Sequence, residues 1–113
     1  MNNIELGHLS IGEDQPAFVI AELGINHNGS IEQAKRLIDE AHKSGASSVK
    51  FQTYITEKRV QKDAPIFDIL KQCEIGFKEQ KELFDYASEI GLIAFSTPFD
   101  NESVDFLSEI NAL

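Results

Sequence analysis

A lysine and a glutamine stand two positions apart in a run that has the pattern of a β-strand. Lys50 and Gln52 lie in the segment SVKFQTY, residues 48–54. Side chains two apart in a strand share one face, so both would point to the same side of a sheet. Burying such polar groups is costly unless they meet partners. The pattern therefore favours a binding site, and the alternative is an edge strand with one solvated face.

A carboxylate closes the preceding apolar run. Glu22 ends the segment FVIAE, residues 18–22, which otherwise resembles a strand covered on both faces. A carboxylate at the mouth of a sheet can act as an acid, a base or a substrate ligand. The simpler alternative is a salt bridge between Glu22 and Lys50.

The loop that follows has the sequence NHNG, residues 26–29, and is dense in hydrogen-bonding groups. It could line a pocket, with Asn26 as a candidate substrate ligand. The alternative is a plain turn in which Asn28 and Gly29 take left-handed backbone conformations. We expect His27 to be structural.

Two hydroxyl groups end a third apolar run. Ser96 and Thr97 come just before Pro98, and Asp100 can cap a helix that begins after them. Hydroxyls and backbone N–H groups at a helix N-terminus suit a phosphate or a carboxylate. The alternative is that these hydroxyls bond only to the local backbone.

Strand-like runs alternate with segments of helical periodicity along the whole chain. The runs cover residues 17–23, 48–54 and 92–97. Helices are expected from about residue 31 to 44, from 78 to 90 and after 100, with a short helical piece near 65–71. A short β-hairpin is expected within residues 4–11.

The helix ends carry recognisable signals. Ser30 and Gln33 predict a capping box, and Gly45 suits the left-handed residue after the first helix. Phe99 is expected to pack against Val104 as a hydrophobic staple at the last helix.

Strand–helix alternation indicates an α/β fold with a parallel sheet and right-handed crossovers. Two architectures fit. One is a complete open sheet of three strands, and the other is the first three units of a (β/α)8 barrel, which needs about 250 residues. In both, function gathers at the carboxyl ends of the strands.

Composition narrows the class of protein. The 113 residues suit one small domain and carry a net charge of −9, which disfavours nucleic acid and anionic membranes as partners. Cys73 is the single cysteine and is expected to be buried, so a reducing compartment is allowed. No signal-peptide pattern and no apolar run of about 20 residues occur, and the cytoplasm is the expected location. Walker, G-x-G-x-x-G, H-E-x-x-H and C-x-x-C motifs are absent.

Three motifs in this order resemble one known family. The segments FVIAELGINHNG, GASSVKFQTY and IAFSTPFD are similar to those of N-acetylneuraminate (sialic acid) synthases and of their legionaminic acid and spore-coat polysaccharide relatives. The likeness covers about residues 16–113. It implies a (β/α)8 barrel that condenses phosphoenolpyruvate with an N-acylated amino sugar, such as N-acetylmannosamine or a diacetamido analogue. The products would be a nine-carbon 2-keto sugar acid and phosphate, and a divalent metal, Mn²⁺ or Mg²⁺, would assist.

The resemblance also implies roles for particular residues. Lys50 matches a lysine that contacts phosphoenolpyruvate, and Gln52 matches a sugar-contacting position. Thr97, with Ser96, matches a phosphoenolpyruvate-binding strand end. Glu22 matches an acidic position near the sugar, so Glu22 and Lys50 are the catalytic candidates.

The metal-binding histidines of the family lie on later strands, so no metal ligand is assigned in residues 1–113. We therefore expect this chain to form the N-terminal part of a barrel, to be inactive alone, and to associate with itself or with the missing barrel portion. The alternatives are a non-catalytic binding or assembly module and an unrelated small flavodoxin-like α/β protein.

Overall fold

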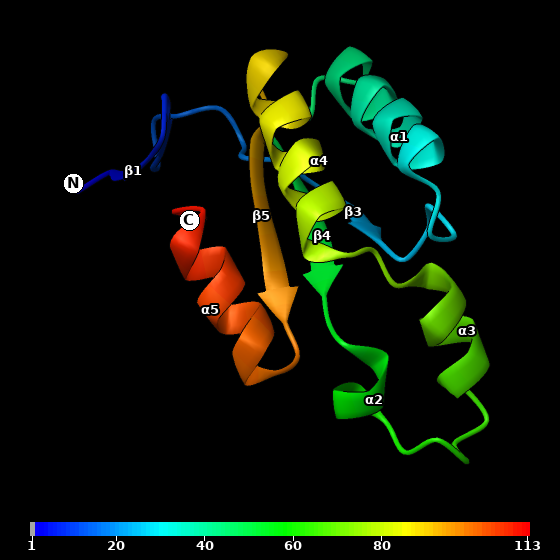
Figure 1. Ribbon diagram of the computed structural model, residues 1–113. Coiled ribbons are helices and arrows are strands. Elements are labelled where there is room, and N and C mark those ends of the chain that lie inside the picture. Colours follow the sequence, from blue (N-terminus) through cyan, green and yellow to red (C-terminus); the bar gives the residue numbers. More distant parts are fainter. Residues whose placement is uncertain (1) are drawn as a thin grey trace.

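The computed structural model describes residues 2–113, and three parallel strands form its central sheet (Figure 1). The sheet order is β3-β4-β5, and β1 and β2 form a separate antiparallel hairpin. The expected α/β fold with a parallel sheet is confirmed. The elements are β1 (Ile4–Leu6), β2 (Leu9–Ile11), β3 (Ile20–Gly24), α1 (Ile31–Lys43), β4 (Ser48–Thr53), α2 (Thr56–Arg59), α3 (Phe67–Cys73), α4 (Phe77–Glu89), β5 (Ile93–Pro98) and α5 (Asn101–Glu109).

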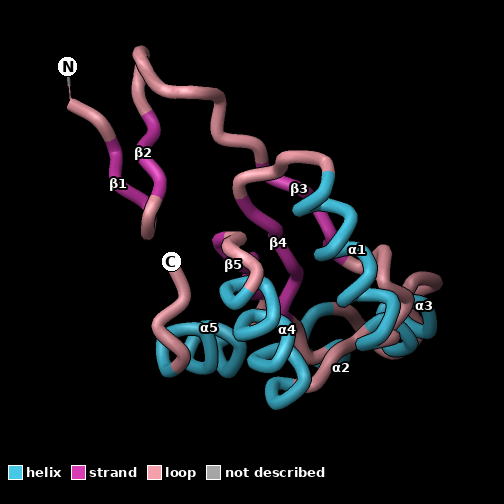
Figure 2. The backbone as a smooth tube through the Cα atoms, turned by 90° about the horizontal axis from the view of Figure 1, so that it is seen from above, coloured by secondary structure: helices cyan, strands magenta, loops and turns pink. Residues whose placement is uncertain are grey.

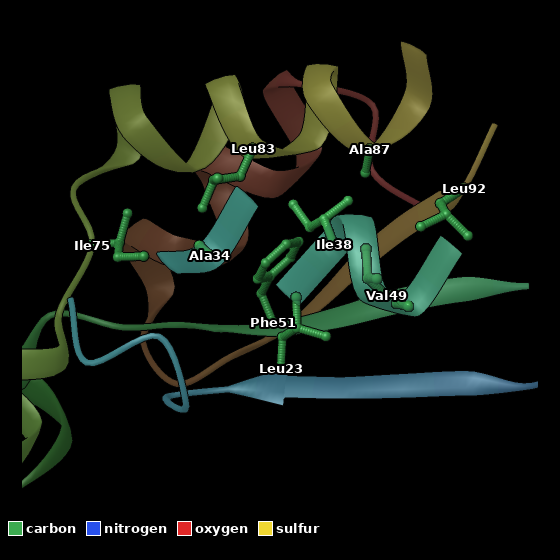
Figure 3. Close-up of a cluster of buried hydrophobic side chains, with 10 residues drawn as sticks. Leu23, Ala34, Ile38, Val49, Phe51, Ile75, Leu83, Ala87 and Leu92 are labelled. Carbon is green, nitrogen blue, oxygen red and sulfur yellow. The ribbon is translucent and has the colours of Figure 1, made fainter. Parts of the chain in front are cut away.

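Helices α1, α4 and α5 lie on one side of this sheet, and α2 and α3 lie beyond the carboxyl ends of its strands (Figure 1). Within residues 2–113 the other side carries no helix (Figure 2). The core lies between the sheet and helices α1 and α4, where Phe51, Ile38 and Leu83 are fully buried and point toward one another (Figure 3). Burying one such side chain stabilises the fold by about 1.5–3 kcal/mol. Because side chains alternate along a strand, burying Phe51 against the helices turns Lys50 and Gln52 to the open face.

Strand β4 is the central strand, so the edge-strand interpretation of residues 48–54 is wrong. The expectation that the first run is covered on both faces is also wrong within the described residues. Val19 is 50% exposed and Ile20 is 42% exposed, since β3 is an edge strand of the described sheet and has helices against one face only.

The predicted helix caps are largely confirmed. Ser30 Oγ accepts from Gln33 N at 3.2 Å, and Asp100 Oδ1 accepts from Ser103 N at 2.8 Å. The reciprocal half of the capping box is wrong, because Gln33 Nε2 donates to Asn26 O at 3.3 Å. That bond ties the start of α1 to the loop before it.

The predicted staple between Phe99 and Val104 stays a prediction, and Val104 is 50% exposed. Phe106 packs on Phe77 of α4 with ring centroids 4.7 Å apart, and it lies on the buried face of α5 with Ser103 and Leu107. Phe99 lies against Arg59, at the end of α2, a helix that the sequence did not reveal.

The predicted hairpin is present, with Gly7 in its turn. A Cβ at Gly7 would lie 3.5 Å from Ile93 Cδ1, so the turn sits over the amino end of β5. None of the helices in residues 2–113 is long and apolar enough to cross a membrane.

Candidate functional site

Four of the polar residues singled out above share the open face of the sheet. In the strand register, Glu22 pairs with Lys50, and Gln52 pairs with Thr97. Paired residues of parallel neighbours point to the same side, and strands lie about 4.8 Å apart. The expectation that these four residues share one face of three adjacent parallel strands is confirmed, with Gln52 and Thr97 near the carboxyl ends and Glu22 and Lys50 at mid-strand. The expected common pocket and the chemical roles stay predictions.

Lys50 Nζ lies 3.2 Å from Glu22 Oε1, so the two residues form an ion pair. This is the salt bridge that the sequence offered as the simpler alternative to a catalytic role. The Glu22 side chain is 64% exposed, and such solvated pairs contribute only about 0–1 kcal/mol to stability. An ammonium group has three donors, so Lys50 keeps capacity for an anionic ligand beside Glu22.

Ser96 and Thr97 face opposite sides of β5. Ser96 pairs in register with Phe51 of the core face, and its Oγ lies 2.7 Å from Thr53 Oγ1. Successive strand residues cannot share a face. The structure therefore brings Thr97 to the open face and leaves Ser96 on the helix-covered side.

The NHNG loop is a tight turn held by its own backbone. His27 is 2% exposed, and its Nδ1 accepts from Gly29 N at 3.0 Å. Burial lowers the His27 pKa, and a hydrogen bond with the Gly24 backbone only partly opposes this. Asn28 and Gly29 have left-handed backbones, with φ of 53° and 77°. The predictions of a turn at these two residues and of a structural role for His27 are confirmed.

Asn26 is exposed and lies at the end of β3. Its Nδ2 donates to Glu22 O at 3.3 Å, and its backbone carbonyl accepts from Gln33 Nε2. Its side chain thus braces the turn next to Glu22, and a ligand role for it stays a prediction.

Sequence reasoning missed Arg59. Its Nη1 donates to Gln52 Oε1 at 2.9 Å, which brings a guanidinium to the carboxyl end of β4. Arg59 Cζ lies 3.7 Å from the Phe99 ring centroid and 4.8 Å from that of Tyr54. A four-residue helix is too short to show periodicity, so no signal in the sequence marks this arginine as part of the site.

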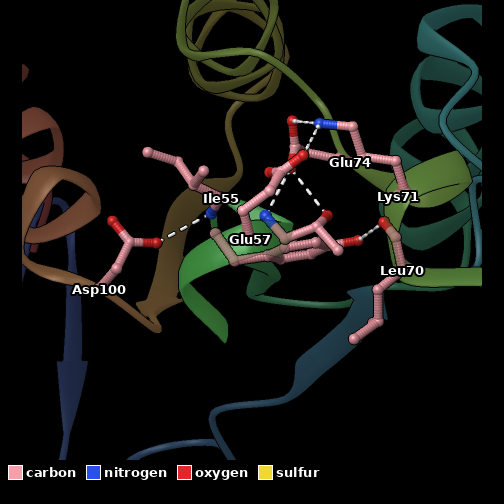
Figure 4. A network of polar contacts seen from close by, with 8 residues as sticks. Ile55, Glu57, Leu70, Lys71, Glu74 and Asp100 are labelled. Atoms are coloured by element: carbon pink, nitrogen blue, oxygen red, sulfur yellow. Dashed lines mark hydrogen bonds and ion pairs between the residues drawn. The ribbon is translucent and has the colours of Figure 1, made fainter. Parts of the chain in front are cut away.

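Contacts from two other elements hold α2 in place (Figure 4). Thr56 N and Oγ1 donate to Glu74 Oε1 at 2.6 and 2.8 Å. Ile55 N donates to Asp100 Oδ2 at 2.8 Å. Burial works to raise the Asp100 pKa, but the hydrogen bonds from Ile55 and Ser103 outweigh it, and the pKa is lowered.

Tyr54 anchors the same segment to α3. Its hydroxyl donates to Leu70 O at 2.6 Å, and burial is the main cause that raises its pKa to about 12. Tyr54 is therefore a neutral donor at ordinary pH. Cys73 is buried, as expected.

Within residues 2–113 no group of three or more His, Cys, Asp or Glu side chains could hold a metal ion. Glu22, whose carboxylate lies on the open face, is already paired with Lys50. These residues do not by themselves fit the divalent metal that the resemblance implies, and no chemical step is derived through one.

Comparison with known proteins identifies the family. The sequence profile of the NeuB family matches residues 37–113, more than half of the chain. The chain belongs to the NeuB family. An uncharacterised protein of Methanocaldococcus jannaschii is 41% identical over 98% of this chain and 33% of its own length. The N,N'-diacetyllegionaminic acid synthase of Legionella pneumophila is 37% identical over 85% of this chain and 31% of its own length.

A solved structure agrees. The sialic acid synthetase of Leptospira borgpetersenii, crystallised with citrate, superposes with a TM-score of 0.91 at 37% identity. The match covers 98% of this chain and 39% of that one. This NeuB-family chain spans about a third of the length of the curated relatives named here. The suspected membership is confirmed, and the unrelated flavodoxin-like alternative is wrong.

Proposed function

We propose that this chain supplies part of the active site of a synthase that condenses phosphoenolpyruvate with an N-acylated amino sugar. The observation that carries the proposal is the presence of Lys50, Glu22 and Gln52 together on the open face of two adjacent strands. Named relatives are sialic and legionaminic acid synthases, which supports a sugar-acid synthase activity for the whole protein.

In this proposal a C–C bond forms between the methylene carbon of phosphoenolpyruvate and the aldehyde carbon of the open-chain sugar. The aldehyde oxygen takes up a proton, and water releases inorganic phosphate to leave the nine-carbon 2-keto acid. Lys50 binds the phosphoenolpyruvate anion, which a chain of net charge −9 would otherwise repel. Thr97 adds a hydroxyl to the same ligand from the next strand.

Glu22 is proposed as the acid or base near the sugar. Its Oε1 lies 3.2 Å from Lys50 Nζ, so the two groups stand together on neighbouring strands. Gln52 is proposed to contact the sugar, and Asn26 braces the adjoining turn. We further propose that the reaction takes place in the cytoplasm.

We propose that residues 1–113 alone do not catalyse the condensation. Positioning two substrates takes ligands from several strands at once, and the described residues offer three strand ends and no metal site. Association with itself or with further barrel strands would be needed to close the site.

The test grafts residues 1–113 in place of the matching third of the Legionella synthase. Phosphate release is measured with phosphoenolpyruvate, Mn²⁺ and either N-acetylmannosamine or a diacetamido sugar, for the graft, its unaltered parent and the 113-residue chain. We expect turnover by the graft and none by the chain alone. Turnover by the isolated chain would refute the incompleteness, and an inactive graft that folds would favour a non-catalytic assembly module.

Lys50→Ala in the graft should lower kcat/KM for phosphoenolpyruvate about 10- to 150-fold, because a lost charge-assisted contact costs about 1.5–3 kcal/mol. Lys43→Ala is the matched control, since Lys43 is an exposed lysine whose Nζ lies 3.0 Å from Glu40 Oε1. Equal kinetics for the two variants would refute the site.

A further inference from the structure

The Gln52 amide has a fixed polarity in this structure. A guanidinium has no acceptor, so the amide atom that faces Arg59 must be the carbonyl oxygen. Arg59 Nη1 lies 2.9 Å from Gln52 Oε1, and the amide nitrogen is therefore at the other end. A Cβ at Gly24 would lie 3.2 Å from Gln52 Nε2, so the N–H donors point toward the end of β3.

Arg59 is itself held by stacking against aromatic rings and not by an ion pair with a carboxylate. Its guanidinium lies 3.7 Å from the Phe99 ring centroid, and the Tyr54 ring stands edge-on to Phe99 at 6.4 Å. Within residues 2–113 Arg59 has no ion-pair partner, and its side-chain bond goes to a neutral amide. Stacking on aromatic faces fixes the plane of an arginine side chain.

The helix that carries Arg59 is also anchored. Glu74 Oε1 accepts twice from Thr56, and Asp100 Oδ2 accepts from Ile55 N, so both the start of α2 and the residue before it are bonded to distant elements. The guanidinium is thus a donor in a fixed position beside the open face, and Gln52 can accept from it only with its carbonyl oxygen.

We propose that Arg59 is a positioning residue that fixes the orientation of the Gln52 amide, so that Gln52 presents N–H donors, and not its carbonyl, to an oxygen acceptor of the sugar substrate. The part that concerns the sugar rests on the proposed function. The orientation of the amide does not, and the two can be tested apart.

The orientation is tested in the 113-residue chain by ¹⁵N relaxation of the side-chain amides. The Gln52 amide should be as ordered as that of Gln33, whose Nε2 donates to Asn26 O. In Arg59→Met, which keeps the apolar stem and removes the donors, the Gln52 amide should become mobile while Gln33 stays ordered. A mobile Gln52 amide in the unaltered chain, or no change in the variant, would overturn the proposal.

The consequence for the sugar is tested in the graft by a double-mutant cycle. Arg59→Met should raise the sugar KM about 2- to 12-fold, as expected for one net hydrogen bond, with kcat and the phosphoenolpyruvate KM unchanged. It should add nothing in a Gln52→Ala background, because Arg59 acts through Gln52. Arg59→Lys, which keeps a donor, should recover part of the loss.

Gln52→Glu separates donor from acceptor. A carboxylate still accepts from Arg59 but has no N–H for the substrate, so the sugar KM should rise as much as in Gln52→Ala. An unchanged sugar KM in Gln52→Glu, or additive effects in the cycle, would overturn the inference while the graft remained active. If the graft without substitutions were inactive, the proposed function would be refuted. The relaxation experiment would still decide the orientation of the amide.

Discussion

Replacing Gly29 with alanine should destabilise the chain far more than replacing Gly45, although both glycines have left-handed backbones. Gly29 has φ of +77° and Gly45 has φ of +84°. An alanine in this region costs about 1–2 kcal/mol of backbone strain at either position. The two sites differ in what the added methyl group would meet.

A Cβ at Gly29 would lie 2.2 Å from the backbone oxygen of Gln72 in α3, whereas a Cβ at Gly45 meets nothing within 4 Å. A backbone oxygen cannot swing aside as a side-chain end can, so the loop and α3 must separate. Such overpacking costs about 1–3 kcal/mol more. We expect losses of about 1–2 kcal/mol for Gly45→Ala and about 2–5 kcal/mol for Gly29→Ala.

Urea unfolding followed by far-ultraviolet circular dichroism measures the stability of both variants at one low protein concentration, chosen to limit self-association. Equal m-values would show that the two losses of stability can be compared. Because Gly29 adjoins the turn behind Glu22, Gly29→Ala should also perturb amide resonances of residues 22–28, while Gly45→Ala should leave them in place. Equal losses of stability in the two variants would refute the idea that the loop is packed against α3.

Three further expectations concern ionisation and assembly. Asp100 has a lowered pKa in the folded chain, so its contribution to the free energy of unfolding is complete above about pH 4 and is lost as the pH falls through the folded pKa. In urea unfolding at pH 7, Asp100→Ala should therefore cost about 1–2 kcal/mol of stability. The variant should also lose stability less steeply at acid pH. His27 also has a lowered pKa, so on acidification the unfolded chain binds a proton at this histidine before the folded chain does. The free energy of unfolding should therefore fall as the pH drops below about 6.5. An NMR titration that found His27 protonating above about pH 6.5 would contradict this. In residues 2–113 the sheet has two unpaired edges, and Val19 and Ile20 are exposed, so the isolated chain should self-associate in light scattering. A stable monomer with a cooperative melt would count against this expectation.

The sequence was informative wherever the physical cause is local. Ser30 and Asp100 cap their helices because a side-chain oxygen reaches an N–H three residues ahead, a contact that any folded context preserves. Lys50 and Gln52 share a face because strand side chains alternate with a period of two. The turn at Asn28 and Gly29 follows from the tolerance of these residues for positive φ.

Helix α2 and its arginine could not be found in this way. The four residues of α2 have no side-chain cap of their own, and the carboxylate that serves their N-terminus belongs to Glu74, 18 positions beyond Thr56. Phe99 was expected to pack on Val104 of the helix that follows it, yet its ring centroid lies 3.7 Å from Arg59 Cζ. Both outcomes depend on segments that meet only after the chain has folded.

Strand alternation alone places Ser96 and Thr97 on opposite sides of one strand, and Lys50 and Phe51 on opposite sides of another. Which member of each pair faces the candidate site depends on how the whole chain packs. Alternation is a property of the strand backbone, but the side that becomes the core is set by where α1 and α4 pack and by the register between β4 and β5. Burial of Phe51 against those helices therefore sends Lys50 and Gln52, with Thr97 beside them, to the open face.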